Sequence, residues 1–111
     1  MEGSERKAAI AAYKQRKIFA GVYAVRCTRT GQRWIGKAPD LSTIQNRIWF
    51  ALRHDGSRSA SLQSAWNSHG EAQFVFEELE RLDEDILPLS REILLKERVV
   101  HWREQFGAEG I

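Results

Sequence analysis

The chain has 111 residues, of which 42% are hydrophobic and 29% charged, and its formal net charge is +2. These values are ordinary for a soluble globular protein and allow one domain with one core. No apolar run reaches the roughly 18 to 20 residues of a membrane span, and no signal-peptide core is visible, so we expect a cytoplasmic protein. The single cysteine, Cys27, excludes an internal disulfide, and no Cys/His cluster has zinc-site spacing.

Charge is unevenly distributed along the chain. Residues 1–70 hold twelve Lys or Arg against four Asp or Glu, a balance of +8, whereas residues 71–111 hold five against eleven, a balance of −6. Such polarity is typical of a basic face that meets phosphate. The alternative is that both runs are solvated surface.

The first part of the chain predicts a helix followed by a β-hairpin. Residues 4–17 are rich in alanine and other helix formers, and Ser4 can cap them, so residues 1–18 read as an N-terminal helical extension. Two strands follow, over about 19–27 and 32–37. The turn "TRTG" between them supplies the glycine of a tight reversal, so the strands should pair antiparallel.

The rest of the chain predicts three helices and one more strand. Ser42 and Gln45 have capping-box spacing and open a helix to about 54, which Gly56 ends. A second helix spans about 59–69, "QFVFEELE" reads as a strand, and a last helix spans about 90–106. We therefore expect an α/β (α+β) domain over 19–106, with a three-stranded antiparallel sheet flanked by helices and a tail over 107–111.

Three polar residues stand at unusual places in these elements. On the last helix Glu97 falls inside a stripe formed by Ile93, Leu94 and Val100, so its carboxylate needs a metal, an ion-pair partner or a wet edge. Arg47 lies at the edge of an apolar stripe and is either a snorkelling arginine or a phosphate clamp. Tyr23 is either ordinary strand packing or the third member of one site.

Two short motifs carry a resemblance to a known family. "GVY" at 21–23 and "WIG" at 34–36, with their spacing, resemble the two motifs of the GIY-YIG nuclease superfamily. The later segments "LQSAWNSHGEAQFVFEELE" and "LLKERVVHW" are similar to the helix, strand and closing acidic helix of that family. The resemblance covers about residues 19–103. It implies a compact nuclease domain that hydrolyses DNA phosphodiester bonds with one divalent metal ion, Mg²⁺ or Mn²⁺, as in DNA repair or mobile-element processing.

The resemblance also implies roles for particular residues. Tyr23 is similar to the tyrosine that activates or orients the attacking water, Arg47 to the arginine that steadies the phosphate, and Glu97 to the single metal ligand. A base role needs a lowered tyrosine pKa, which Arg47 and the metal would favour. Trp34 stands where the second motif has a tyrosine, and its indole can donate a hydrogen bond but cannot take a proton.

Other expectations complete the site. Gly21 and Gly36 let the backbone and substrate approach closely, and His54 can reach the space near Arg47. DNA contacts, mostly to phosphate, are expected from five further cations, Arg26, Arg33, Lys37, Arg53 and Arg58. We expect no small-molecule cofactor. The alternative function is a catalytically degenerate module that binds nucleic acid or a protein partner without cleavage. Oligomeric state is open, since Trp49 and Phe50 could form an exposed apolar edge.

Overall fold

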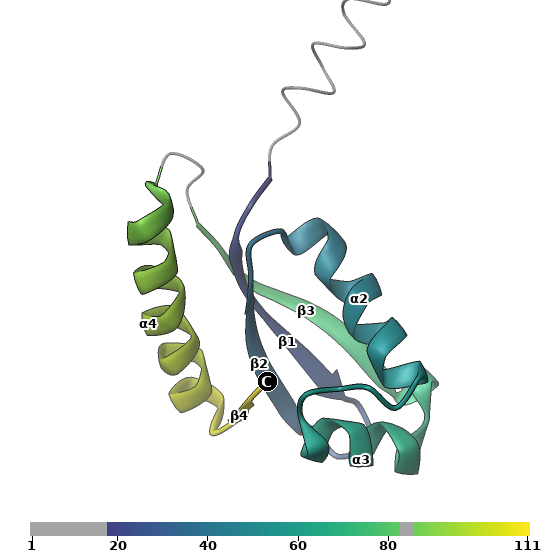
Figure 1. The fold of residues 1–111 in the computed structure, drawn as a ribbon. Helices are drawn as coiled ribbons and strands as arrows, with labels where there is room; N and C mark the ends of the chain where they lie inside the picture. The colour runs from purple at the N-terminus through teal and green to yellow at the C-terminus, as the bar shows by residue number, and fades with distance from the viewer. Residues whose placement is uncertain (1–17, 83–85) are drawn as a thin grey trace, which may run out of the picture.

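The computed structural model describes residues 18–82 and 86–111. The helix predicted over 4–17 and its Ser4 cap lie outside these residues. The described chain forms one four-stranded sheet with strand order β3-β1-β2-β4 and three α-helices around it (Figure 1). The elements are β1 Gly21–Cys27, β2 Arg33–Ala38, α2 Leu41–Arg53, α3 Ala60–His69, the 3₁₀ turn η1 Glu71–Gln73, β3 Phe74–Arg81, α4 Pro88–Phe106 and β4 Glu109–Gly110.

The predicted hairpin is confirmed. β1 and β2 pair antiparallel, and Tyr23 stands opposite Gly36. The turn between them closes through the Gly31 N–H, which donates to the Cys27 carbonyl at 2.8 Å. Gly31 has a φ of 76°, a left-handed conformation that glycine adopts without strain. The predicted third strand is also present, as β3, and pairs antiparallel with the other edge of β1.

The sheet has four strands, so the expectation of three is wrong. Gly107 ends α4 in a left-handed conformation with φ 59° and reverses the chain. The chain then runs along the free edge of β2, where β4 pairs parallel with it. The Ile111 N–H extends this contact by donating to the Ile35 carbonyl at 2.9 Å. The expected tail over 107–111 is therefore a turn and a short edge strand.

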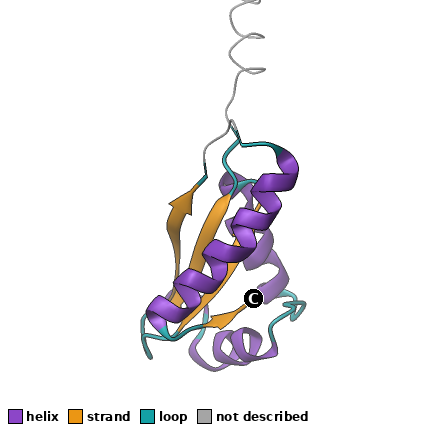
Figure 2. Cartoon of the chain, turned by 90° about the vertical axis from the view of Figure 1, so that its left-hand side faces the viewer, coloured by secondary structure: helices purple, strands orange, loops and turns teal. Residues whose placement is uncertain are grey.

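Helices cover both faces of the sheet. Alternation along β1 sends Tyr23, Val25 and Cys27 into the main core with residues of α2 and α3. The intervening Val22 and Ala24 face the other way and pack under α4. Figure 1 shows α2 and α3 on one side of the sheet and α4 on the other, and Figure 2 shows α4 running diagonally across its face.

The buried face of α4 differs from the predicted stripe. Leu95 is buried, and Leu94, Val99 and Trp102 pack against the cores on the sheet. Ile93 and Val100, which were expected to face inward with Leu94, are 53% and 49% exposed. Because apolar residues occupy several directions around this helix, two stripes fit the periodicity, and packing on the sheet selects the one through Leu95 and Val99.

The start of α2 also differs from the prediction. The helix begins at Leu41, and the N-cap is Asp40, whose carboxylate accepts a hydrogen bond from the Ser42 N–H at 2.9 Å. Ser42, predicted to be the cap, therefore lies inside the first turn. An aspartate in extended conformation just before the helix satisfies a free N–H group of the first turn, which is the role that was predicted for Ser42. Within the described part of the chain, no helix is long and apolar enough to cross a membrane.

Candidate active site

A pocket of about 540 Å³ opens between α2, the end of β2 and the loop that precedes α3. Tyr23 and Arg47, two of the three residues predicted to form the site, both line it. The described lining contains no carboxylate side chain. Its members are Tyr23, Gly36, Lys37, Pro39, Ile44, Arg47, Ile48, Ala51, Gly56, Ser57, Arg58, Leu62 and Ile111.

The Tyr23 side chain is placed by strand alternation and by the residue opposite it. Its ring is only 3% exposed and stacks on Phe76 with a centroid separation of 5.3 Å. Gly36 lies opposite Tyr23 on β2. A Cβ at Gly36 would come within 2.4 Å of the Tyr23 hydroxyl oxygen, so the absence of a side chain there makes room for the phenol. Gly36 therefore makes room for the Tyr23 ring, whereas the prediction was that it lets the backbone and substrate approach closely.

Burial governs the protonation state of this phenol. Desolvation raises the pKa of Tyr23 to about 12, because the buried site disfavours the charged phenolate. The expectation that Arg47 lowers this pKa is therefore wrong for the protein by itself. At neutral pH Tyr23 carries its proton. It can donate a hydrogen bond to an anion or accept one from water, but it is a poor proton acceptor.

Arg47 and Arg58 bring positive charge to the pocket. Arg47 lies on α2 beside Ile44, Ile48 and Ala51, which form the apolar wall. Both arginines are exposed, and neither guanidinium group forms a hydrogen bond or ion pair with another residue in 18–82 or 86–111. Two free guanidinium groups without a carboxylate partner make this a site for an anion.

Glu97 is separated from this pocket. It is exposed on α4, which packs on the Val22, Ala24 and Ile35 face of the sheet, whereas Tyr23 points toward α2. Its helix neighbour Arg98 does not pair with it, because the Arg98 Nε donates to Glu80 Oε1 at 2.7 Å. The structure thus brings together the predicted phenol and guanidinium and leaves the predicted carboxylate apart.

The pocket does not offer the ligands that a divalent cation needs. Mg²⁺ and Mn²⁺ prefer oxygen donors, above all carboxylates. The described lining has no carboxylate side chain, and no group of three or more His, Cys, Asp or Glu side chains that could hold a metal occurs among the described residues. The donor set present therefore fits phosphate and does not by itself fit Mg²⁺.

Trp34 and His54 lie outside the pocket lining. Trp34 is completely buried, and its indole N–H donates to the Ser61 hydroxyl at 3.2 Å, which ties β2 to α3. His54 is exposed at the C-cap of α2, and its ring rests on Phe50 with a centroid separation of 4.3 Å. Trp34 is thus part of the core, and His54 belongs to the outer surface of α2.

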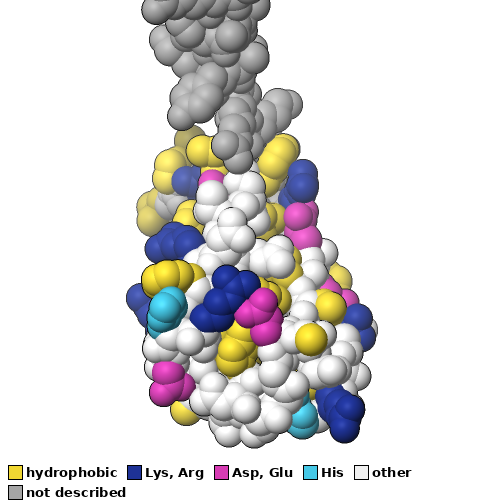
Figure 3. Space-filling view, turned by 90° about the vertical axis from the view of Figure 1, so that its right-hand side faces the viewer, with side chains coloured by type: hydrophobic (Ala, Val, Ile, Leu, Met, Phe, Trp, Pro, Cys, Tyr) yellow, Lys and Arg dark blue, Asp and Glu magenta, His cyan; other side chains and the backbone are white. Residues whose placement is uncertain are grey.

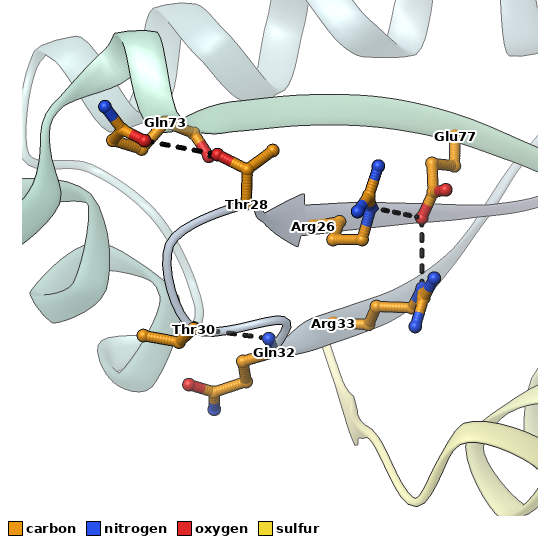
Figure 4. Close-up of polar contacts among 7 residues, drawn as sticks. All are labelled: Arg26, Thr28, Thr30, Gln32, Arg33, Gln73 and Glu77. Carbon is orange, nitrogen blue, oxygen red and sulfur yellow. Dashed lines mark hydrogen bonds and ion pairs between the residues drawn. The ribbon is translucent and has the colours of Figure 1, made fainter.

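The five cations predicted to bind DNA do not form one surface. Arg26 and Arg33 project on the α4 side of the sheet and share the carboxylate of Glu77, with Nε–Oε1 distances of 3.4 and 3.1 Å (Figure 4). Lys37 lines the pocket, but its ammonium forms an ion pair with Glu92 of α4.

The last two cations lie on the α2 side. Arg53 makes a two-point ion pair with Glu71, at 2.6 and 2.9 Å, so its charge is neutralised. Arg58, also from the predicted set, lines the pocket together with Arg47. Its guanidinium has no carboxylate partner among the described residues. Figure 3 shows the face on which α2 lies, with Lys and Arg side chains among mostly uncharged ones.

Sequence reasoning missed the loop that closes the pocket. Ser57 lines it, and its N–H donates to the side chain of Gln63 at 3.1 Å. Gln63 is 8% exposed and also donates to the Leu52 carbonyl at 2.9 Å, so it fixes the loop between α2 and α3. The only signal in the sequence was a polar residue on the inward side of a predicted helix, which has many structural explanations.

Comparison with known proteins identifies the fold. The sequence matches no known family model and no curated protein. Two solved structures are similar. The catalytic domain of homing endonuclease I-TevI matches with a TM-score of 0.71 and 23% identity, over 83% of this chain and 97% of that one. The catalytic domain of intron endonuclease I-TevI in a glutamate-to-alanine mutant form matches with a TM-score of 0.69 and 23% identity, over 81% and 86%.

These similarities define the class of fold. The chain has the fold of the I-TevI catalytic domain, which confirms the fold implied by the resemblance drawn from "GVY" and "WIG". The protein that it resembles in structure is I-TevI, an endonuclease.

Proposed function

We propose that this protein is a nuclease that hydrolyses phosphodiester bonds in DNA. The observation that carries the proposal is that the Tyr23 phenol and the Arg47 guanidinium line one pocket, whose described lining contains no carboxylate side chain. The fold of an endonuclease catalytic domain supports the same conclusion. A phosphodiester is the anion that suits both the two free arginines and this fold.

The proposed reaction is attack of water on phosphorus in the pocket. A P–O bond to the water oxygen forms while the P–O bond to one sugar oxygen breaks. The water gives its proton to solvent, and the leaving sugar oxygen takes up a proton to become a hydroxyl group. Arg47 and Arg58 hold the non-bridging oxygens, whose charge grows in the transition state, and a fixed guanidinium stabilises that charge without reorganising. Tyr23 acts in its neutral form. Its hydroxyl accepts a hydrogen bond from the attacking water or donates one to a phosphate oxygen, so it positions the reactants and does not act as the base.

Binding of Mg²⁺ or Mn²⁺ by Glu97 stays a prediction from the resemblance. When bound, such an ion would supply further positive charge to the phosphate. The described pocket lining offers no carboxylate side chain for it. The steps proposed above therefore depend on Tyr23, Arg47 and Arg58 alone.

The proposal is tested by nicking of supercoiled plasmid DNA. We expect cleavage by the wild-type chain and a loss of about 100-fold or more in Arg47→Ala, since this removes a group that contacts the developing charge. Lys96→Ala is the matched control, because it deletes one exposed positive charge on α4 that does not line the pocket. Cleavage by Arg47→Ala at the wild-type rate would contradict the proposal. Parallel reactions with Mg²⁺, Mn²⁺ or EDTA, and with Glu97→Ala, test the metal prediction.

A second candidate is a module that binds nucleic acid without cutting it. Two observations favour it. Trp34 occupies the second-motif tyrosine position as a buried core residue, and the raised pKa of Tyr23 leaves the pocket without an evident base. This candidate predicts binding to labelled DNA that Arg47→Ala weakens, with no product in the plasmid assay under any metal condition.

A further inference from the structure

We propose that the exposed aromatic pair on the outer ridge of α2, Phe50 and His54, is a stacking platform for an unpaired base of the bound DNA. This inference rests on the proposed function and deepens it, because it names the substrate class as DNA with unpaired nucleotides beside the bound phosphate. The platform lies outside the pocket lining and has no part in the reaction described above.

The side chains of Phe50 and His54 are both exposed to solvent. Phe50 is 63% exposed, whereas the preceding Trp49 is 8% exposed and packs edge-on against Trp66 at 5.5 Å. A large apolar ring in water is costly unless something covers it. The prediction of an apolar edge at Trp49 and Phe50 therefore holds for Phe50 alone.

The two rings form one continuous aromatic surface. Their centroids are 4.3 Å apart with an interplanar angle of 46°. His54 is the C-cap residue of α2, and its backbone N–H donates to the Phe50 carbonyl at 3.2 Å, so the backbone holds the two residues together. Aromatic side chains have few rotatable bonds, so they lose little conformational entropy when a base stacks on them.

The platform lies next to the anion site. Phe50 follows Arg47 by three residues on α2, which places it about 60° around the helix and roughly 4.5 Å farther along its axis. Arg47 therefore stands between the pocket and the platform. A strand with one phosphate at Arg47 can lay a neighbouring base on Phe50.

Charge selects nucleic acid as the occupant. Arg47 and Arg58 lack carboxylate partners among the described residues, whereas Arg53, the next cation on this helix, is already neutralised by Glu71. Unpaired cations beside an exposed aromatic side chain are the combination that binds single-stranded nucleic acid. Bases inside a duplex are already stacked on their neighbours, so only unpaired or displaced bases can use the platform.

The test uses a single-stranded oligonucleotide that carries 2-aminopurine, whose fluorescence is quenched by stacking, and a duplex of the same sequence. With the wild-type chain we expect quenching and binding of the single strand. Phe50→Ala should remove the quenching and weaken single-strand binding about 5- to 100-fold while leaving duplex binding within about twofold. Phe50→Trp should retain both signals. Leu89→Ala, which deletes an exposed apolar side chain on α4, is the control.

Several results would overturn the platform. These are absence of quenching in the wild type, equal loss of single-strand and duplex binding in Phe50→Ala, or no change in that variant. A change of sedimentation coefficient in Phe50→Ala would assign the ring to a protein interface instead. The readout needs no cleavage, so it separates the two proposals. Quenching without plasmid nicking would reject the nuclease proposal and support the platform. Nicking without quenching would reject the platform and support the nuclease proposal.

Discussion

The ring of Tyr23 fills the space that a side chain on Gly36 would need. The two residues face each other across β1 and β2, and a Cβ at Gly36 would lie 2.4 Å from the phenol oxygen and 2.5 Å from the ring carbon that bears it. The second-motif glycine thus sets the position of the first-motif tyrosine. The consequence is that the motifs depend on each other through packing.

Gly36→Ala is expected to displace the Tyr23 ring. Phe76 stacks on Tyr23, so the ring cannot retreat without disturbing the core. We expect a loss of about 1 to 3 kcal/mol in the free energy of unfolding, measured by urea denaturation. Gly56→Ala is the matched control for stability, because its Cβ would meet only the Ala51 carbonyl oxygen at an ordinary 3.5 Å. Equal free energies of unfolding for the two variants would show that the Tyr23 ring can accommodate a Cβ at Gly36.

The pH dependence of cleavage reports on the role of Tyr23. Because burial raises the pKa of Tyr23 to about 12, only roughly one molecule in ten thousand carries the phenolate at pH 8. If Tyr23 were the base, the cleavage rate would rise about tenfold per pH unit from 7 to 10. We expect no such rise that depends on Tyr23. The measurement compares the rate profiles of the wild type and Tyr23→Phe. A tenfold-per-unit slope that disappears in Tyr23→Phe would assign the tyrosine as the base.

Arg47→Ala should change the salt dependence of DNA binding. Each cation that contacts a phosphate releases counterions, so the slope of log Kd against log salt counts such contacts. We expect the slope to fall by about 1 in Arg47→Ala and to stay unchanged in Lys96→Ala. Filter binding or anisotropy at 50 to 300 mM salt (roughly the range in which such slopes are linear) provides the measurement. Unchanged slopes in both variants would mean that Arg47 does not touch phosphate.

Glu80→Gln should loosen α4 from the sheet. Glu80 on β3 accepts hydrogen bonds from Trp102 Nε1 at 2.9 Å and Arg98 Nε at 2.7 Å, both from α4. We expect a loss of about 1 to 3 kcal/mol in the free energy of unfolding at pH 7. Glu104→Gln is the control, since that residue is exposed near the end of the same helix.

The same carboxylate gives the stability a pH dependence. Burial alone would raise the pKa of Glu80, but hydrogen bonds from Trp102 and Arg98 outweigh it and hold this pKa below its usual range. The folded state therefore binds this proton less readily than the unfolded state does. The contribution of Glu80 to the free energy of unfolding is complete at a pH above the ordinary glutamate pKa. It is lost as the pH falls through the lowered pKa of Glu80 in the folded state. We expect the difference between wild type and Glu80→Gln to shrink between pH 5 and pH 3, and a constant difference would contradict this assignment.

Local patterns in the sequence determined much of this protein. The alternation in "GVYAVRC", the glycine of the turn and the apolar faces of the helices are patterns over a few residues, so the hairpin, β3, α2 and α3 could be predicted. The spacing of "GVY" and "WIG" identified the architecture that the solved structures confirm. Tyr23 and Arg47 were predicted as partners, and both line the pocket.

Only the tertiary structure decided how the remaining parts of the site are arranged. The parallel pairing of β4 and the choice of buried face on α4 depend on contacts between segments far apart in the chain. The periodicity of apolar residues within one segment does not show which of these contacts form. That choice leaves Glu97 exposed on the other side of the sheet from Tyr23. The pKa of Tyr23 likewise follows from burial, and burial is a property of the assembled core and not of the "GVY" motif.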